Sequence, residues 1–236
     1  MKLTYIFHSG FVIEGERFTL IMDYFKDTNE SFVRSHLPSF PGQVYVFASH
    51  WHPDHFNPEI RNWKQLRSDI QYLFSRDILR KRKALSSEAV FLVKGETWQD
   101  ERICVRAFGS TDVGVSFLIE AEGKRIFHAG DLNNWHWNEE STPEEAEACE
   151  RHFLKEIALL AQATDRLDVA MFPVDARLGK DYMRGAEQFV DRIRVGLFSP
   201  MHFTLAYEKA EAFRPYAERA GCRFAGWKAK GESLDF

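Results

Sequence analysis

The sequence predicts an α/β protein in which two β-rich halves, each covered by helices on its outer side, form a four-layer αβ/βα sandwich. Two observations support this prediction. Short runs of β-branched and aromatic residues separated by glycine-containing turns fill the first half of the chain, and helical patterns alternate with strand-like runs in the second half. Nothing between residues 1 and 236 resembles a linker rich in Gly, Ser or Pro, so we expect one domain, 1–236.

The first strands are expected at 2–7, 11–14 and 17–22. Turn sequences around Gly10 and Gly15 separate them, which favours antiparallel pairing. A further apolar run at 44–48 has the character of a strand buried on both faces, and it leads directly into a histidine-rich segment. The histidines are therefore expected where a strand ends.

The middle of the chain predicts helices at 58–67 and 76–83 and strands at 70–74, 89–93, 102–108, 115–120 and 125–128. The clearest helix begins at Thr142, with Pro143 at its first position and Glu145 completing a capping box. Apolar residues from Ala146 to Leu160 then recur at helical spacing, and we interpret that stripe as core contact. The remaining chain predicts strands at 168–172, 195–199 and 223–226 and helices at 183–193 and 206–219.

Composition excludes several classes of protein. The 44% hydrophobic and 14% aromatic content is ample for a packed core, which argues against disorder. A net charge of -4 without a basic stripe argues against a nucleic-acid partner, and no apolar stretch approaches the length of a membrane span. Three widely spaced cysteines predict free thiols, and the amino terminus lacks the features of a signal peptide, so we expect a cytoplasmic protein.

The segment from His50 to His55 carries the chemistry of the chain. His50, His52, Asp54 and His55 form the pattern H-x-H-x-D-H. Imidazole suits borderline divalent metals, and a carboxylate adds a harder ligand that can also take a proton from water. His50 and His52 can converge on one ion while Asp54 and His55 turn towards a second. The pattern therefore predicts a metal centre.

This pattern resembles that of the metallo-β-lactamase-fold hydrolases, over nearly the whole chain. The resemblance implies a bridging carboxylate at Asp131, in Phe-His-Ala-Gly-Asp, and a late histidine ligand at His202, in Pro-Met-His. It also implies the metallo-β-lactamase fold and hydrolysis by a metal-activated water. The hairpin around His8 and the Pro-Met-His segment are most similar to the branch that contains ascorbate-6-phosphate lactonase.

One departure from the family pattern concerns the first metal position. The family's third histidine is expected in a turn whose counterpart here is Phe-Gly-Ser-Thr-Asp, with Ser110 in the place of the histidine. A neutral hydroxyl is a poor zinc ligand, so this position is expected to be weakened. Asp112 could substitute as a ligand or could form the turn, and we favour the turn.

Candidate substrate contacts come from two loops. Asp131 is followed by a polar and aromatic cluster, which makes Asn133, Trp135 and His136 candidates. In a later loop, Arg177 and Lys180 could bind a carboxylate or phosphate, although solvated loop charges explain them equally well. His8 could lie at the rim of the site, but we favour a structural role for it.

These residues favour a hydrolase acting on a small ester, lactone or phosphoester, with one or two divalent ions as cofactor. Zinc is the expected ion, with manganese or iron as alternatives. Asp54 is the candidate to orient or deprotonate the attacking water, and either Asp54 or His136 could protonate the leaving group. A metal-binding sensor or scaffold that has lost hydrolysis is the alternative, which the Ser110 departure favours. The expected partner is a small-molecule substrate, with no nucleic acid and no membrane; the oligomeric state is left open.

Overall fold

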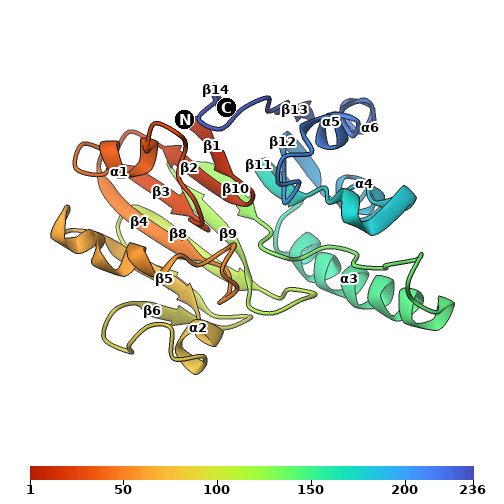
Figure 1. The fold of residues 1–236 in the computed structure, drawn as a ribbon, viewed down its shortest axis with the longest axis horizontal. Helices are drawn as coiled ribbons and strands as arrows, with labels where there is room; N and C mark the ends of the chain where they lie inside the picture. The colour runs from red at the N-terminus through yellow and green to blue at the C-terminus, as the bar shows by residue number, and fades with distance from the viewer.

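The computed structural model describes residues 1–236 and contains two mixed sheets packed face to face (Figure 1). The first sheet has the order β14 (Ser233–Asp235), β1 (Lys2–Phe7), β2 (Gly10–Glu14), β3 (Phe18–Met22), β4 (Gln43–Ala48), β5 (Gln71–Ser75), β6 (Val90–Leu92). The second has the order β13 (Arg223–Phe224), β12 (Arg194–Met201), β11 (Arg166–Pro173), β10 (Lys124–His128), β9 (Ser116–Ala121), β8 (Ile103–Phe108), β7 (Thr97–Gln99). The predicted αβ/βα sandwich is therefore confirmed.

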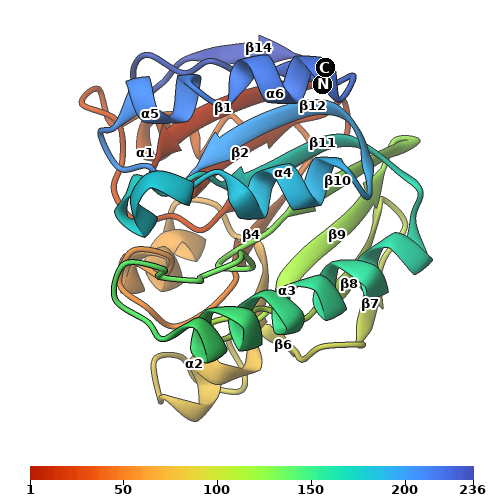
Figure 2. The ribbon, with the colours of Figure 1, turned by 90° about the vertical axis from the view of Figure 1, so that its right-hand side faces the viewer.

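Helices cover the outer face of each sheet. Beside the first sheet lie α1 (Phe32–His36), the 3-10 helix η1 (Pro58–Gln65) and α2 (Arg76–Arg80). On the outer side of the second lie α3 (Pro143–Ala163), α4 (Arg184–Val190), α5 (Tyr207–Glu211) and α6 (Arg214–Arg219), as Figure 2 shows. The 3-10 helix η2 (Ala176–Asp181) connects β11 to α4. None of these helices has a segment long and apolar enough to cross a membrane.

Burial on both faces explains the apolar strand sequences. In β4, Tyr45 and Phe47 belong to a cluster of 51 buried residues that fills the space between the sheets and reaches α3 and α4. The alternate residues Val44 and Val46 belong to a separate cluster of 18 buried residues under α1, η1 and α2. Because successive strand side chains point to opposite faces, one apolar run supplies both clusters.

The helix boundaries follow the sequence signals in part. The capping box of α3 is formed as predicted, since the Thr142 hydroxyl accepts the N–H of Glu145 and the Glu145 carboxylate accepts the N–H of Thr142. The single helix predicted at 206–219 is instead two, α5 and α6. Pro215 lies in the first turn of α6, where its missing N–H costs nothing, whereas it would interrupt a continuous helix. The sequence analysis also missed α1, β7, η2 and β14.

Both sheets change from antiparallel to parallel pairing at one strand, β3 in the first and β10 in the second. The parallel strands β3, β4, β10, β11 and β12 end near one another, at one end of the sandwich. Loops that follow the carboxyl ends of parallel strands are the usual place for binding sites in α/β folds. This is the end at which the predicted site residues lie.

Candidate metal centre

Eight side chains that can bind a metal converge at this end of the sandwich. They come from the β1–β2 hairpin, from the β8–β9 loop and from the loops after β4, β10 and β12. We call one set the first group and the other the second group; within each, the ligand atoms lie within 4.8 Å of one another. The first group is His50, His52, Asp112 and Asp131, and the second is His8, Asp54, His55 and His202. All six ligands predicted from the sequence are thus brought together.

Asp131 lies between the two groups. Its Oδ2 atom is 3.3 Å from Nε2 of His50, in the first group. Its Oδ1 atom is 3.0 Å from Nε2 of His55 and 3.3 Å from Nε2 of His202, in the second. One carboxylate oxygen therefore faces each group, which is the arrangement that a bridging ligand needs.

Several polar atoms of the centre are buried without a hydrogen-bond partner. They are Nε2 of His8, His50, His55 and His202, together with Oδ1 of Asp131. Leaving a buried polar group unsatisfied costs about 1–3 kcal/mol, so their concentration at one point needs a reason. Imidazole nitrogens and carboxylate oxygens are the preferred donors for zinc and similar ions, and divalent cations held by the two groups would satisfy all five atoms.

The spacing of the donor atoms also fits a cation. Ligands bonded at 2.0–2.1 Å to a tetrahedral ion lie about 3.4 Å apart. In the first group, Nδ1 of His52 is 3.4 Å from Oδ2 of Asp112. In the second group, Nε2 of His8 is 3.3 Å from Oδ2 of Asp54. These distances exceed those of good hydrogen bonds and match the separation between two ligands of one ion.

Two buried carboxylates orient the histidines. Asp23 follows β3, and its Oδ2 atom accepts a hydrogen bond from Nδ1 of His55 at 2.7 Å. Asp175 follows β11, and its Oδ2 atom lies 2.8 Å from Nδ1 of His202. A carboxylate on one ring nitrogen keeps the proton there and leaves Nε2 free as a metal ligand.

The sequence analysis did not identify either carboxylate. Each follows the carboxyl end of a strand, as the motif histidines do, and this position was the available signal. Asp23 also has a positive φ of 40°, which most residues avoid. Such backbone strain persists where surrounding contacts demand it, often at functional sites.

The contacts of Asp112 and His8 in the structure differ from those expected from the sequence. Ser110, not Asp112, forms the turn, because its hydroxyl accepts the N–H of Asp112 at 3.3 Å. The Asp112 carboxylate instead faces His52 in the first group. His8 lies within the second group and not at its rim, and its Nε2 atom has no hydrogen-bond partner, unlike that of a satisfied structural histidine.

Electrostatics keep the carboxylates of the centre charged. Burial opposes the charge of Asp54, but the proximity of His8 and His55 holds the pKa of Asp54 below its usual range. Burial lowers the pKa of His8 to about 4, so its imidazole is neutral near pH 7 and can act as a ligand. Asp54 is therefore an acceptor at neutral pH, suited to orienting a water molecule.

A pocket of about 390 Å³ opens beside the centre. Asp131 and His202 line it, as do Trp135 and Trp137, whose ring planes are 15° apart. The Trp135 indole N–H donates to the Asp131 carbonyl at 2.8 Å, which fixes this indole ring against the centre. The remaining lining residues are Thr111, Asp112, Cys149 and Arg177.

Of the predicted substrate contacts, Trp135 and Arg177 line this pocket, and Asn133, His136 and Lys180 do not. Asn133 and His136 are fully buried. Both ring nitrogens of His136 are engaged, one with the Asp181 carbonyl and one with the N–H of Asn138, so His136 has no free nitrogen to protonate a leaving group. Both residues serve the packing of their loop, which corrects the interpretation from sequence. Lys180 is exposed, outside the pocket.

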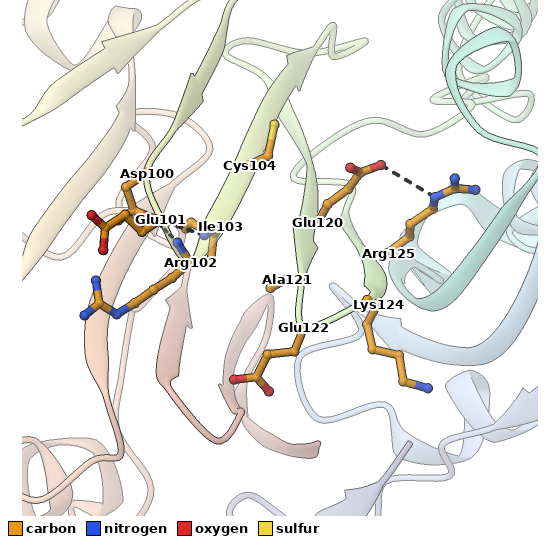
Figure 3. A pocket seen from close by; sticks show the side chains of 11 residues that line it. Asp100, Glu101, Arg102, Ile103, Cys104, Glu120, Ala121, Glu122, Lys124 and Arg125 are labelled. Atoms are coloured by element: carbon orange, nitrogen blue, oxygen red, sulfur yellow. Dashed lines mark hydrogen bonds and ion pairs between the residues drawn. The ribbon is translucent and has the colours of Figure 1, made fainter.

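Another crevice, of about 450 Å³, lies at the opposite ends of β8, β9 and β10 (Figure 3). Its charged lining is paired in part, as between Glu120 and Arg125, whose atoms are 3.5 Å apart. None of its lining residues has a buried polar atom without a partner. It therefore lacks the feature that marks the metal centre.

Comparison with known proteins identifies the family of this chain. Residues 2–146 match the model of the beta-lactamase superfamily domain. A UPF0173 metal-dependent hydrolase of Alkaliphilus metalliredigens is 24% identical over 217 residues, covering 86% of this chain and 85% of that protein. Among solved structures, Igni18, a metallo hydrolase of Ignicoccus hospitalis, is 18% identical with a TM-score of 0.69, covering 100% of this chain and 98% of that one. The metallo-beta-lactamase fold protein YhfI of Bacillus subtilis is 12% identical with a TM-score of 0.65, covering 99% and 98%. The fold agrees with both structures, and the family match covers more than half of the chain, which therefore belongs to the beta-lactamase superfamily.

Proposed function

We propose that this chain is a metal-dependent hydrolase that acts on a small ester, lactone or phosphoester. The observation that carries the proposal is the set of five buried, unpartnered donor atoms on His8, His50, His55, Asp131 and His202 beside an open pocket. The family match and the relative named as a metal-dependent hydrolase support it. Zinc is the proposed ion, because imidazole supplies most of the donors.

A divalent ion, if held by these groups, would lower the pKa of a nearby water and would offer positive charge to the oxygen of the bond under attack. The protein's own residues do the rest. Asp54, whose side chain is 39% exposed and charged at neutral pH, can accept a hydrogen bond from that water and orient it towards the pocket. Asp54 is then also the candidate to return a proton to the leaving group, since His136 is excluded by its burial.

Arg177 is the proposed contact for a negatively charged group of the substrate. Its Nε and Nη2 atoms are held by the Asp175 carboxylate, whereas Nη1 has no partner. The side chain is 64% exposed and lines the same pocket as Trp135 and Trp137. A guanidinium fixed in this way can bind a carboxylate or phosphate oxygen. The lactonase-like branch predicted from sequence fits such a substrate and remains part of the proposal.

The test is turnover by metal-stripped and zinc-reloaded protein of p-nitrophenyl acetate, a homoserine lactone and bis(p-nitrophenyl) phosphate. Metal-dependent hydrolysis of at least one is expected, and it should be lost in Asp54→Ala. Absence of turnover by fully loaded protein, across this panel and a wider set of carboxylate and phosphate esters, would favour the sensor or scaffold alternative.

Arg177 can be tested on the substrate that gives turnover. Arg177→Ala should raise KM for a substrate with a carboxylate or phosphate group by about tenfold to hundredfold, which corresponds to the loss of a charge-assisted hydrogen bond of about 1.5–3 kcal/mol. A neutral analogue should be little affected. Equal effects on both substrates would refute anion recognition by Arg177.

A further inference from the structure

We propose that His8 and Asp112 are metal ligands from outside the motif, each completing one of the two groups that meet at Asp131. The inference rests on the metal centre proposed above. It adds to that centre two ligands that lie outside the H-x-H-x-D-H motif, one from the β1–β2 hairpin and one from the β8–β9 loop. It also replaces the expectation that the Ser110 departure leaves the first position short of a ligand.

His8 has the properties of a ligand and lacks those of a structural histidine. Its Nδ1 atom faces the Thr204 hydroxyl at 3.3 Å, while Nε2 is buried, unpartnered and 3.3 Å from Oδ2 of Asp54. Its ring centroid is 4.1 Å from that of His202. The unpartnered Nε2 edge of the His8 ring therefore lies beside two other members of the second group, Asp54 and His202.

The backbone at His8 is held in an unfavourable conformation. His8 has φ 58° and His202 has φ 64°, both in the left-handed region that non-glycine residues rarely adopt. The two are joined directly, since the His8 carbonyl accepts the N–H of His202 at 3.1 Å. His8 and His202 are neighbours in space, and each has an unpartnered Nε2 atom. The backbone strain at both residues is explained if both rings must reach the same ion.

Asp112 is presented to the first group by its loop. Its carboxylate lies within 4.0 Å of no Lys or Arg side chain, and His52, at 3.4 Å, is its one ion-pair partner. The loop is pressed against the motif at Gly114, which has φ +81° and where a Cβ would lie 2.5 Å from that of His50. Only glycine fits so close an approach, and that approach brings the loop that carries Asp112 against the segment that carries His50 and His52.

The two positions should differ in strength. The first combines two imidazoles with the carboxylates of Asp112 and Asp131, and the Asp112 and His52 side chains are 41% and 30% exposed. The second has three imidazoles, and those of His55 and His202 are almost completely buried. The ion at the first position is therefore expected to bind more weakly and to exchange first, and its greater carboxylate share should make it more tolerant of manganese.

The test is the metal content of the full chain. Protein stripped with a chelator is reloaded with zinc, dialysed and measured by elemental analysis, and zinc affinities are measured by calorimetric titration. The wild type should hold two ions, one for each group, and Asp112→Ala should hold one. His8→Asn, in which asparagine tolerates the positive φ, should weaken the tighter position by at least tenfold. Adding Ser110→His to Asp112→Ala should restore the second ion if the turn accommodates the ring.

Matched controls come from the same chain. Asp181→Ala removes a carboxylate at the end of η2 that lies outside both groups, and His152→Ala removes an exposed imidazole on α3; both should keep two ions. A folded Asp112→Ala protein that retains two ions, or a wild type that holds only one, would overturn the inference. If the wild type hydrolyses a substrate but holds only one ion, the proposed function stands and the ligand inference is refuted. If it holds two ions but hydrolyses nothing, the ligand inference stands and the proposed function is refuted.

Discussion

Replacing Asp23 with Asn should weaken metal binding while almost preserving the shape of the side chain. Asp23 is completely buried behind the centre. Its Oδ1 atom accepts the N–H of Ser49 at 2.7 Å, and Oδ2 accepts both the Ser49 hydroxyl at 2.6 Å and Nδ1 of His55 at 2.7 Å. The Ser49 oxygen in turn lies 3.0 Å from Nδ1 of His50. One carboxylate thus sets the protonated nitrogen of a histidine in each group.

Asparagine would invert this network. Its oxygen must stay on the Ser49 N–H, because an amide NH₂ there would oppose another donor. The NH₂ group would then face His55 and the Ser49 hydroxyl. His55 must accept at Nδ1 and so carry its proton on Nε2, the atom that faces Asp131. The Ser49 hydroxyl, no longer able to donate to residue 23, would donate to Nδ1 of His50 and move that proton to Nε2 as well.

Loss of such an orienting contact costs about tenfold to hundredfold in metal affinity, or about 1.4–2.7 kcal/mol. With both groups affected, the upper end of that range is expected. The assay is zinc competition against a chromophoric chelator, after circular dichroism has shown that the variant is folded. The matched control is Asp100→Asn, whose carboxylate likewise accepts backbone N–H groups, those of Arg102 and Ile103, but lies at the other end of the sheets. Wild-type zinc affinity in folded Asp23→Asn would refute the reasoning.

Three further predictions follow from the site and from α3. Asp54→Ala should leave a folded protein but lower kcat by about 10²–10⁴-fold, the usual contribution of a positioned proton acceptor; unchanged turnover would remove Asp54 from the mechanism. Chelator treatment should lower stability by about 2.7 kcal/mol relative to protein with metal a hundredfold above its Kd, and Tm by about 5–11 °C; an unchanged Tm after verified removal would count against a built-in site. Thr142→Ala breaks the capping box of α3 and should cost about 1 kcal/mol, or about 2–4 °C in Tm, without altering metal content; a loss of metal would mean that α3 supports the centre more directly than its contacts show.

The convergence of the motif residues could be predicted from sequence because their spacing is local. His50, His52, Asp54 and His55 follow β4 directly, so their convergence needs only a strand end and a short loop. Asp131 and His202 also follow strands, β10 and β12, and a family resemblance was enough to place them beside the motif. The same reasoning reached the fold, since alternating turn signals and the capping box of α3 are local features as well.

The interpretations that differ from the structure depend on contacts between distant segments. The position of His8 within the centre depends on Asp54 and His202, which lie far along the chain. Whether Asn133 and His136 face the pocket is decided by η2 and α4, which pack over their loop: a Cβ on Gly185 would lie 1.9 Å from the Asn133 side-chain oxygen. No periodicity in residues 131–138 carries that information, because an irregular loop has no face that spacing can define.

The centre also joins the two halves of the sandwich. The first sheet and its loops supply His8 and the whole H-x-H-x-D-H motif, whereas the second supplies Asp112, Asp131 and His202. Neither group can be completed from one sheet, so a metal ion would add to the cohesion that the core between the sheets provides. Because each oxygen of Asp131 faces a different group, the loss of one ion would also change the charge that the other ion experiences. The two positions should therefore be energetically coupled through Asp131. Substitution of a ligand in the first group is expected to change the metal affinity of the second group as well.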